Sequence, residues 1–336
     1  MNKIAFFDAK PYDIDSFKST VKSENKDFEI TFFKNHLDSS TINLVNGFEI
    51  ICLFVNDQVT AEMMSVLKKN GVKLIALRCA GYNNIDLKAS AAHNIRVVRV
   101  PSYSPHAVAE HALALMMTLN RKTHKAYGRT RDSNFTIGGL LGFDMAGKTA
   151  GIIGTGQIGK VLIKILRGLE MRVLAYDVVE DSALAKTLGF EYVPLEKLFK
   201  DSEIISLHCP LNKQTEHIIN AKSIALMKKG VMIINTGRGK LIDTQDLIQG
   251  LKSNHVGFAG LDVYEEESQY FFEDFSQNVL NDDVLARLLT FNNVLITSHQ
   301  AFFTAEAMHN IALTTLQNIK DFIAHKPLVN EVQVSL

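Results

Sequence analysis

The stretch of residues 148–177 constrains the fold most, because it reads as a strand, a glycine-rich turn, a helix and a second strand in that order. Gly154, Gly156 and Gly159 stand at G-x-G-x-x-G spacing directly after an apolar run. At this spacing the first glycine permits a tight turn, the second lets the backbone approach a pyrophosphate, and the third lets helix and strand pack closely. The N-terminus of the helix adds free N–H groups and a partial positive charge. The stretch predicts a dinucleotide-binding Rossmann unit, with a plain glycine-rich surface turn as the alternative.

Asp177 ends the second strand of this unit. A carboxylate at that place accepts hydrogen bonds from the adenosine ribose and repels the 2′-phosphate of NADP, so we expect NAD as the cofactor. No lysine or arginine follows within residues 178–181 to bind such a phosphate. The predicted cofactor-binding residues of this stretch are Gly154, Thr155, Gly156, Gln157, Ile158, Gly159 and Asp177.

A chain of 336 residues is too long for one ordinary core and predicts about two domains. Its 36 basic and 36 acidic residues balance without a basic block, so neither a nucleic-acid nor a membrane partner is expected. The N-terminus shows no secretory leader pattern, and we expect a cytoplasmic protein. Cys52, Cys79 and Cys209 are odd in number and widely spaced, which argues against a disulfide framework and a zinc site.

Strand-like and helical patterns alternate on both sides of the glycine motif. The strands are expected at residues 3–7, 28–33, 49–55, 73–77 and 96–100, and again at 204–209, 231–235, 257–263 and 294–297. Helical patterns cover residues 60–70, 105–127 and 304–325, and the helix 105–127 is expected to connect the domains. The alternation predicts two doubly wound α/β domains with parallel sheets.

Three groups of polar residues stand at predicted strand ends, where open α/β sheets bind ligands. Arg238 lies between two glycines after strand 231–235, and its guanidinium can hold a carboxylate or a keto oxygen in a bidentate way. Asp262 is followed by three consecutive acids, Glu265, Glu266 and Glu267, for which a solvated loop is the simplest interpretation. His299 follows strand 294–297 and can transfer a proton, with a capping or core histidine as the alternative.

The remaining candidates are expected to be structural. His106, His111 and His208 lack a metal-binding pattern, so no metal site is predicted. Cys209 and Pro210 end a strand of the nucleotide-binding unit, where Cys209 can border the cofactor without acting as a nucleophile. The aromatic residues after the acids are expected to anchor their loop; they are Phe271, Phe272 and Phe275.

Seven segments together resemble the D-isomer-specific 2-hydroxyacid dehydrogenase family, in particular its D-lactate-forming branch: LRCAGYNNIDL, VRVPSYSPHAVAEHALALMMTLNR, GIIGTGQIGK, ISLHCPL, INTGRGKLIDTQDL, GLDVYEEE and TSHQAFFTAEA. The resemblance places Arg238, Glu267 and His299 at the catalytic positions, and so selects the last of the three acids. It implies that Ala80, Gly81, Tyr103 and Phe302 bind substrate, and that Cys209, Pro210, Thr236, Gly237 and Asp262 border the cofactor.

The resemblance further implies an interleaved architecture. Residues 1–100 and 300–336 would form a flavodoxin-like substrate domain, residues 101–299 the NAD-binding Rossmann domain, and the active site would lie in the cleft between them. The implied reaction is the reduction of pyruvate to D-lactate with NADH, in a homodimer or a higher homo-oligomer. Two alternatives are a dehydrogenase for a bulkier D-2-hydroxy acid and, on the same fold, an NAD(H)-sensing corepressor-like binding module.

Overall fold

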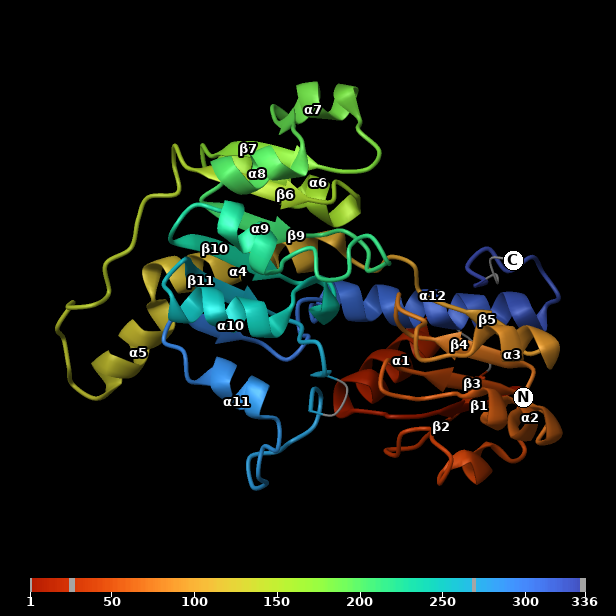
Figure 1. Ribbon diagram of the computed structural model, residues 1–336. Coiled ribbons are helices and arrows are strands. Elements are labelled where there is room, and N and C mark those ends of the chain that lie inside the picture. Colours follow the sequence, from red (N-terminus) through yellow and green to blue (C-terminus); the bar gives the residue numbers. More distant parts are fainter. Residues whose placement is uncertain (1, 24–27, 268–269, 333–336) are drawn as a thin grey trace. The chain divides into compact units, whose positions relative to one another are not determined.

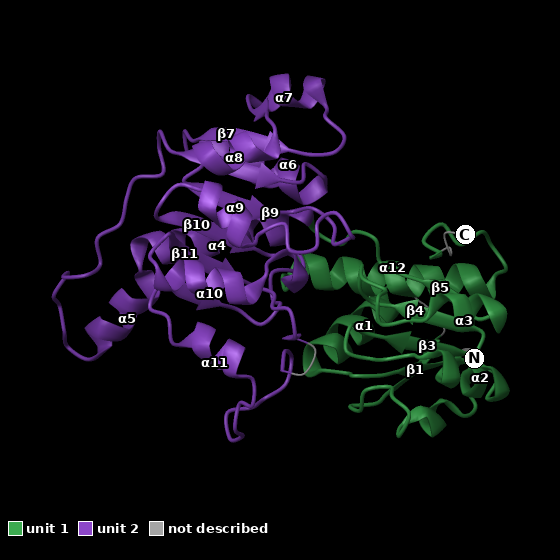
Figure 2. Cartoon of the chain, viewed as in Figure 1, with its two compact units in different colours: residues 1–104, 303–336 green, residues 105–302 purple. Residues whose placement is uncertain are grey.

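The computed structural model describes residues 2–23, 28–267 and 270–332, and divides into two compact units. Unit 1 consists of residues 1–104 and 303–336, and unit 2 of residues 105–302 (Figure 2). Each unit is built on its own parallel sheet, of five strands in unit 1 and seven in unit 2. The prediction of two parallel α/β domains is confirmed.

Unit 1 has the strand order β2-β1-β3-β4-β5, which is the flavodoxin-like order. Its elements are β1 (Asn2–Phe6), α1 (Pro11–Ser23), β2 (Phe28–Phe32), η1 (Ile42–Val45), β3 (Ile50–Leu53), α2 (Ala61–Lys69), β4 (Leu74–Leu77), α3 (Leu87–Ala92), β5 (Arg96–Val98) and α12 (Ala305–Ile323). Successive residues of β1 face opposite layers: the Phe6 ring contacts Phe17 of α1 at 4.8 Å between centroids, whereas Ala5 packs in the cluster that contains Met64 of α2.

Unit 2 has the order β12-β11-β10-β9-β6-β7-β8, in which the direction of winding reverses between β6 and β9. Its strands are β6 (Thr149–Ile153), β7 (Arg172–Tyr176), β8 (Glu191–Tyr192), β9 (Ile204–Leu207), β10 (Val231–Asn235), β11 (Val256–Leu261) and β12 (Val294–Ile296). Its helices are α4 (Pro105–Arg121), α5 (Thr123–Arg131), α6 (Gln157–Gly168), α7 (Ser182–Leu188), α8 (Leu195–Asp201), α9 (Ala221–Leu226), η2 (Gly239–Leu241), α10 (Thr244–Lys252) and α11 (Asp283–Leu289).

Two apolar layers enclose the sheet of unit 2 (Figure 1). Ile152 and Ile234 point into the layer that contains Leu115 of α4 and Leu162 of α6. Their neighbours along the strands, such as Ile153 and Ile233, point into the opposite layer with α8, α9 and α10. The reversal between β6 and β9 therefore lies at the centre of a sheet covered on both faces, which is where doubly wound folds bind ligands.

Two expectations about helices need correction. The predicted helix 105–127 ends at Arg121, because Lys122 adopts a left-handed conformation with φ +50° and a separate helix, α5, begins at Thr123. This helix, α4, lies wholly within unit 2, which begins at Pro105. The expectation that it connects the two domains is therefore wrong. The helix predicted at residues 60–70 is present as α2.

Candidate functional site

The register of the unit 2 sheet aligns the ends of five strands. Ile153 pairs with Leu207, Leu207 with Asn235, Asn235 with Leu261, and Leu261 with Ile296. Because all five strands are parallel, the next residue of each strand emerges at the same edge of the sheet. These next residues are Gly154, His208, Thr236, Asp262 and Thr297. The sequence-predicted residues of unit 2 therefore gather along one carboxyl edge.

The glycine turn at this edge uses each glycine differently. Gly154 has φ +100°, and a Cβ there would lie 2.6 Å from the backbone nitrogen of Cys209. A Cβ on Gly159 would lie 2.1 Å from the carbonyl oxygen of Gly154, so only glycine lets α6 pack against the turn. A Cβ on Gly156 would meet nothing within 4 Å among the described residues. The backbone at Gly156 is thus open for the close approach of a phosphate group at the start of α6.

Asp177 faces back onto this turn. Its Oδ2 accepts hydrogen bonds from the N–H and the hydroxyl of Thr155, at 2.6 and 3.0 Å. Its Oδ1 accepts one from the N–H of Val179 at 3.2 Å. Burial by itself would raise the pKa of Asp177, but the hydrogen bonds from Thr155 and Val179 outweigh it and lower the pKa. The group is therefore a carboxylate at neutral pH and keeps acceptor capacity on Oδ1.

The residues of this edge fit a dinucleotide. The hydroxyl of Thr236 is buried and finds no hydrogen-bond partner among the described residues, which suits a polar group of a bound cofactor. Burial raises the pKa of the Cys209 thiol to about 11, so Cys209 is a neutral neighbour of the turn and not a nucleophile. Pro210 continues the chain from Cys209 at the surface.

Arg238 follows β10 in a turn held by the side chain of Asn235. Asn235 donates to the carbonyl of Arg238 at 2.8 Å and accepts from the N–H of Gly237 at 3.0 Å. The guanidinium itself donates to the carbonyl of Gly237 at 2.8 Å and is half-buried. A Cβ on Gly239 would lie 2.1 Å from the carbonyl carbon and oxygen of Tyr264, so the turn of Arg238 rests directly on the chain that leads to the three acids.

The structure separates the three consecutive acids. Glu265 accepts from the N–H of Thr244 at 2.9 Å and pairs with the His217 ring at 2.8 Å, so its carboxylate is already used within the fold. The side chain of Glu266 is exposed. Glu267 accepts from the N–H of Tyr264 at 2.9 Å and lies 2.8 Å from Nδ1 of His299. The solvated-loop interpretation is thus wrong for Glu265 and Glu267.

His299 lies in a turn that the buried carboxylate of Asp262 holds. His299 has φ +48°, and its N–H donates to the carbonyl of Asp262 at 2.7 Å. The Asp262 carboxylate accepts from the N–H groups of Gln300 and Ala301, at 2.9 and 2.8 Å, and from the hydroxyl of Thr297. His111 lies 3.0 Å from the same hydroxyl. The sequence did not indicate this role for His111, because no spacing relates α4 to a turn so far along the chain.

The aromatic residues after the acids divide into two kinds. Phe271 is buried in the core and anchors the loop, as predicted from the sequence. The ring of Phe272 lies 5.9 Å from that of His299, and Phe275 packs on Tyr270 at 5.3 Å. Phe272 therefore screens one side of the imidazole. Phe302, the last residue of unit 2, is buried.

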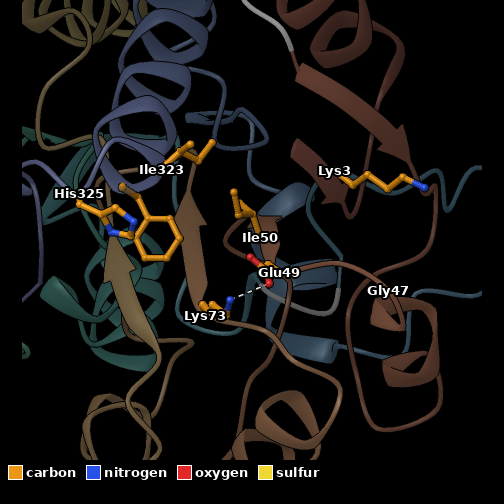
Figure 3. Close-up of a pocket in the computed structure, with 8 residues that line it drawn as sticks. Lys3, Gly47, Glu49, Ile50, Lys73, Ile323 and His325 are labelled. Atoms are coloured by element: carbon orange, nitrogen blue, oxygen red, sulfur yellow. Dashed lines mark hydrogen bonds and ion pairs between the residues drawn. The ribbon is translucent and has the colours of Figure 1, made fainter. Parts of the chain in front are cut away.

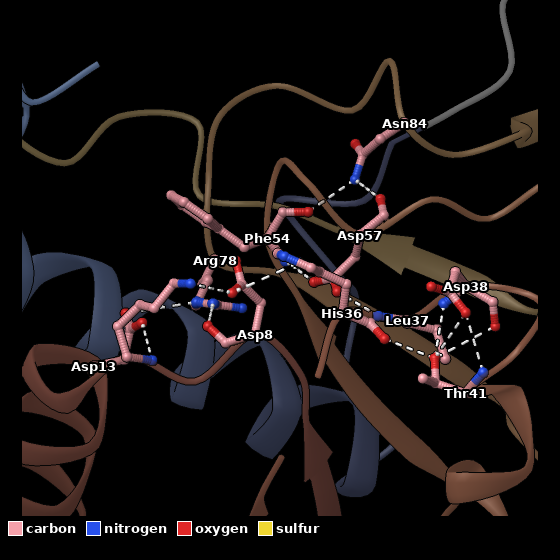
Figure 4. A network of polar contacts seen from close by, with 11 residues as sticks. Asp8, Asp13, His36, Leu37, Asp38, Thr41, Phe54, Asp57, Arg78 and Asn84 are labelled. Atoms are coloured by element: carbon pink, nitrogen blue, oxygen red, sulfur yellow. Dashed lines mark hydrogen bonds and ion pairs between the residues drawn. The ribbon is translucent and has the colours of Figure 1, made fainter. Parts of the chain in front are cut away.

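In unit 1, Ala80 and Gly81 follow the carboxyl end of β4, after the buried Arg78 and Cys79. The Arg78 guanidinium lies 4.4 Å from the ring centroid of Phe6 and 4.7 Å from that of Phe54. It donates a hydrogen bond to the carbonyl of Asp8 (Figure 4). This network fixes the strand end from which the predicted substrate segment departs. Tyr103 is held through its backbone carbonyl, which accepts from Asn310 of α12 at 2.8 Å.

The opposite, amino end of the unit 1 sheet has a cavity of about 400 Å³ (Figure 3). It is lined by Lys3, Glu49, Lys73 and His325, among others, and the Lys73 ammonium pairs with Glu49 at 2.6 Å. None of the sequence-predicted site residues lines it. Within the described residues, no helix is both long and apolar enough to span a bilayer.

Comparison with known proteins gives consistent matches over most of the chain. Residues 113–301 match the family model for the NAD-binding domain of D-isomer specific 2-hydroxyacid dehydrogenases. A D-lactate dehydrogenase of Escherichia coli K12 is 50% identical over 98% of this chain and 99% of its own length. The solved structure of a pyruvate reductase of Chlamydomonas reinhardtii superimposes with a TM-score of 0.93 and 43% identity, covering 98% of each chain. A D-2-hydroxyisocaproate dehydrogenase structure does so with a TM-score of 0.84 and 33% identity, covering 98% of this chain and 99% of that one.

Gly239→Ala should destabilise unit 2, because the new methyl group would overlap the backbone of Tyr264. Forcing extra atoms into a packed site costs about 1 to 3 kcal/mol, which lowers the thermal midpoint by roughly 2 to 10 °C. Gly168→Ala is the matched control, since a Cβ on Gly168 at the end of α6 meets nothing within 4 Å among the described residues. Equal melting temperatures for both variants in calorimetry would contradict the close contact between the Arg238 turn and Tyr264.

Proposed function

The chain belongs to the D-isomer-specific 2-hydroxyacid dehydrogenase family, and from this premise we propose that it is an NAD-dependent D-lactate dehydrogenase that reduces pyruvate with NADH. The observation that carries the proposal is the His299–Glu267 pair, 2.8 Å apart, on the same sheet edge as Arg238 and the glycine turn. An imidazole oriented by a carboxylate is the group that a hydride-transfer dehydrogenase needs for the accompanying proton.

The nucleotide would be held by unit 2. The glycine turn and the N-terminus of α6 would receive its pyrophosphate, and Asp177 its adenosine ribose. Thr236, Gly237, Cys209 and Pro210 would border it, and Asp262 would lie near the nicotinamide. The bound cofactor supplies the hydride that reaches C2 of the keto acid.

The chain's own residues would bind the substrate and deliver the proton. Arg238 would hold the 2-keto acid through paired N–H groups, and the backbone at Ala80 and Gly81 would bind its carboxylate. Nδ1 of His299 is occupied by Glu267, which leaves Nε2 to donate a proton to the oxygen of the forming alkoxide. Glu267 would stabilise the imidazolium and fix its orientation. The reaction then balances as pyruvate, NADH and a proton going to D-lactate and NAD⁺.

The side chains of Tyr103 and Phe302 would restrict the space beyond C3 of the substrate. An apolar pocket discriminates one methylene by only about 1 to 3 kcal/mol, so larger 2-keto acids should be slow but measurable substrates. The similarity to a D-2-hydroxyisocaproate dehydrogenase keeps a bulkier substrate as the second candidate. The cytoplasmic location expected from the sequence stays a prediction.

The purified protein should oxidise NADH with pyruvate and form the D-isomer of lactate. The assay compares kcat/KM for pyruvate, phenylpyruvate and 2-ketoisocaproate, and for NADH and NADPH, with chiral analysis of the product. We expect pyruvate and NADH to be preferred, because the Asp177 carboxylate repels a 2′-phosphate. A preference for 2-ketoisocaproate would favour the second candidate, and an absence of turnover with every keto acid would favour a binding module.

His299→Gln should lower kcat about 100- to 10,000-fold and leave NADH affinity unchanged, since it deletes the proton donor alone. Glu267→Gln should also lower kcat, because the imidazolium loses its ionic partner. Glu266→Gln is the matched control and should behave like the unmodified protein, because its side chain is exposed. Steady-state kinetics and NADH fluorescence titration measure both quantities. A large loss of kcat from Glu266→Gln would overturn the assignment of Glu267.

We also propose that the chain is a homo-oligomer joined through the segment 122–144 of unit 2. This segment contributes no buried side chain from α5 and exposes Tyr127, Phe135, Ile137 and Leu141, each at least 64% exposed. It extends away from the sheet of its own unit (Figure 1). It also borders a hollow of about 750 Å³. An apolar set of this kind marks an interaction surface, and a second copy supplies the same apolar segment in return.

Light scattering should give the unmodified protein a mass at least twice the 37.4 kDa of one chain. The double change Phe135→Asp and Ile137→Asp should shift the mass to that of a monomer, because it places charges in the contact. Val329→Asp, at an exposed apolar position of unit 1, is the control and should leave the mass unchanged. A monomeric unmodified protein would contradict the proposal.

A further inference from the structure

Arg99 of unit 1 holds the proposed substrate segment, which is residues 79–82. Arg99 follows β5, and its guanidinium donates to the carbonyl of Ala80 at 2.8 Å. The same guanidinium lies 5.2 Å from the ring centroid of Tyr82, one residue beyond Gly81. Arg99 therefore contacts the carbonyl of the Ala80–Gly81 peptide and the side chain of the residue that follows this peptide.

The backbone of Arg99 is itself fixed. Its N–H donates to the carbonyl of Asn330, and its carbonyl accepts from the side chain of Asn318 in α12 at 2.9 Å. The segment is also held at its start, where the N–H of Val100 donates to the carbonyl of Cys79 and the Cys79 thiol contacts the carbonyl of Gly81. The guanidinium thus reaches the Ala80 carbonyl from a rigid base, so it can define the orientation of that peptide plane.

The orientation of this peptide decides where one donor points. The chain has only trans peptide bonds among its described residues, so the Gly81 N–H points opposite to the Ala80 carbonyl. Because Arg99 binds that carbonyl, the Gly81 N–H is directed away from Arg99. It finds no acceptor among the described residues and is available to a ligand.

The charge of Arg99 acts in the same direction. No carboxylate of the described residues forms an ion pair with Arg99, whereas Arg96, three residues earlier in β5, pairs with Glu331. A guanidinium on the carbonyl side also polarises the peptide and makes its N–H a stronger donor. An anion bound at the Gly81 N–H would gain from both effects.

We propose that Arg99 is a positioning residue for the substrate carboxylate: it fixes the Ala80–Gly81 peptide so that the Gly81 N–H faces the ligand, and it adds an uncompensated positive charge behind that peptide. The inference rests on the proposed function, because that function assigns the carboxylate to Ala80 and Gly81. Arg99 itself does not contact the reacting atoms.

The test compares Arg99→Met and Arg99→Lys with Arg96→Met as the matched control. Arg99→Met should raise KM for pyruvate and Kd for oxamate roughly 10- to 100-fold, the range expected for losing a charge-assisted hydrogen bond. The Kd for NADH should stay within about two-fold in every variant, and Arg99→Lys should fall between Arg99→Met and the unmodified protein. Arg96→Met should change none of these constants.

Methyl pyruvate, which lacks the carboxylate charge, separates a positioning role from a structural one. In Arg99→Met the ratio of kcat/KM for pyruvate to that for methyl pyruvate should fall about 10-fold or more, whereas general loosening of the fold would leave the ratio unchanged. An unchanged ratio, or equal losses of pyruvate and NADH affinity, would overturn the role of Arg99. Should the unmodified protein prefer another 2-keto acid, the proposed pyruvate specificity fails, and the same comparison with that acid and its ester still tests Arg99.

Discussion

The parallel register of the unit 2 sheet is the constraint on which the site depends. Because Ile153, Leu207, Asn235, Leu261 and Ile296 lie side by side, every loop that follows them begins at one edge. The turns at Gly154, Arg238 and His299 are therefore close to one another in the fold, although they are far apart in the sequence. A register shift of one residue in any strand would move each of its side chains to the opposite face of the sheet. The same strand pairing therefore specifies both the apolar core and the positions of the site residues.

Within that edge, backbone and buried side chains set the positions of the functional groups. One carboxylate, that of Asp262, accepts three hydrogen bonds from the turn that carries His299. On the next strand, Asn235 holds both sides of the Arg238 turn. Both side chains are fully buried, where an unsatisfied partner is costly. These hydrogen bonds restrict the backbone at His299 and at Arg238, and so limit the movement of both side chains.

The sequence predicted the features that follow from neighbouring residues, such as turns and strand ends. It did not predict the features that depend on contacts between distant residues. The glycine spacing and the strand ends were readable because turn geometry and parallel topology follow from neighbouring residues. The break at Lys122 was not predictable, because no glycine or proline stands between Leu119 and Tyr127, yet Lys122 adopts a left-handed conformation with φ +50°. Likewise, only the partners of Glu265 and Glu267 distinguish these acids, and those partners, His217 and His299, lie far away in the sequence.

Unit 1 is formed by two separate stretches of the chain, and this determines the order in which its elements are synthesised. Unit 2 is continuous, so all its strands and helices have left the ribosome once residue 302 has emerged. Unit 1 is not: its five strands are made first, but α12, which packs on α1 and β4, is made last. The part of the first sheet around β4 that α12 contacts therefore lacks this helix for most of translation. The N-terminal part of this chain is thus where a nascent-chain chaperone has the longest time to act.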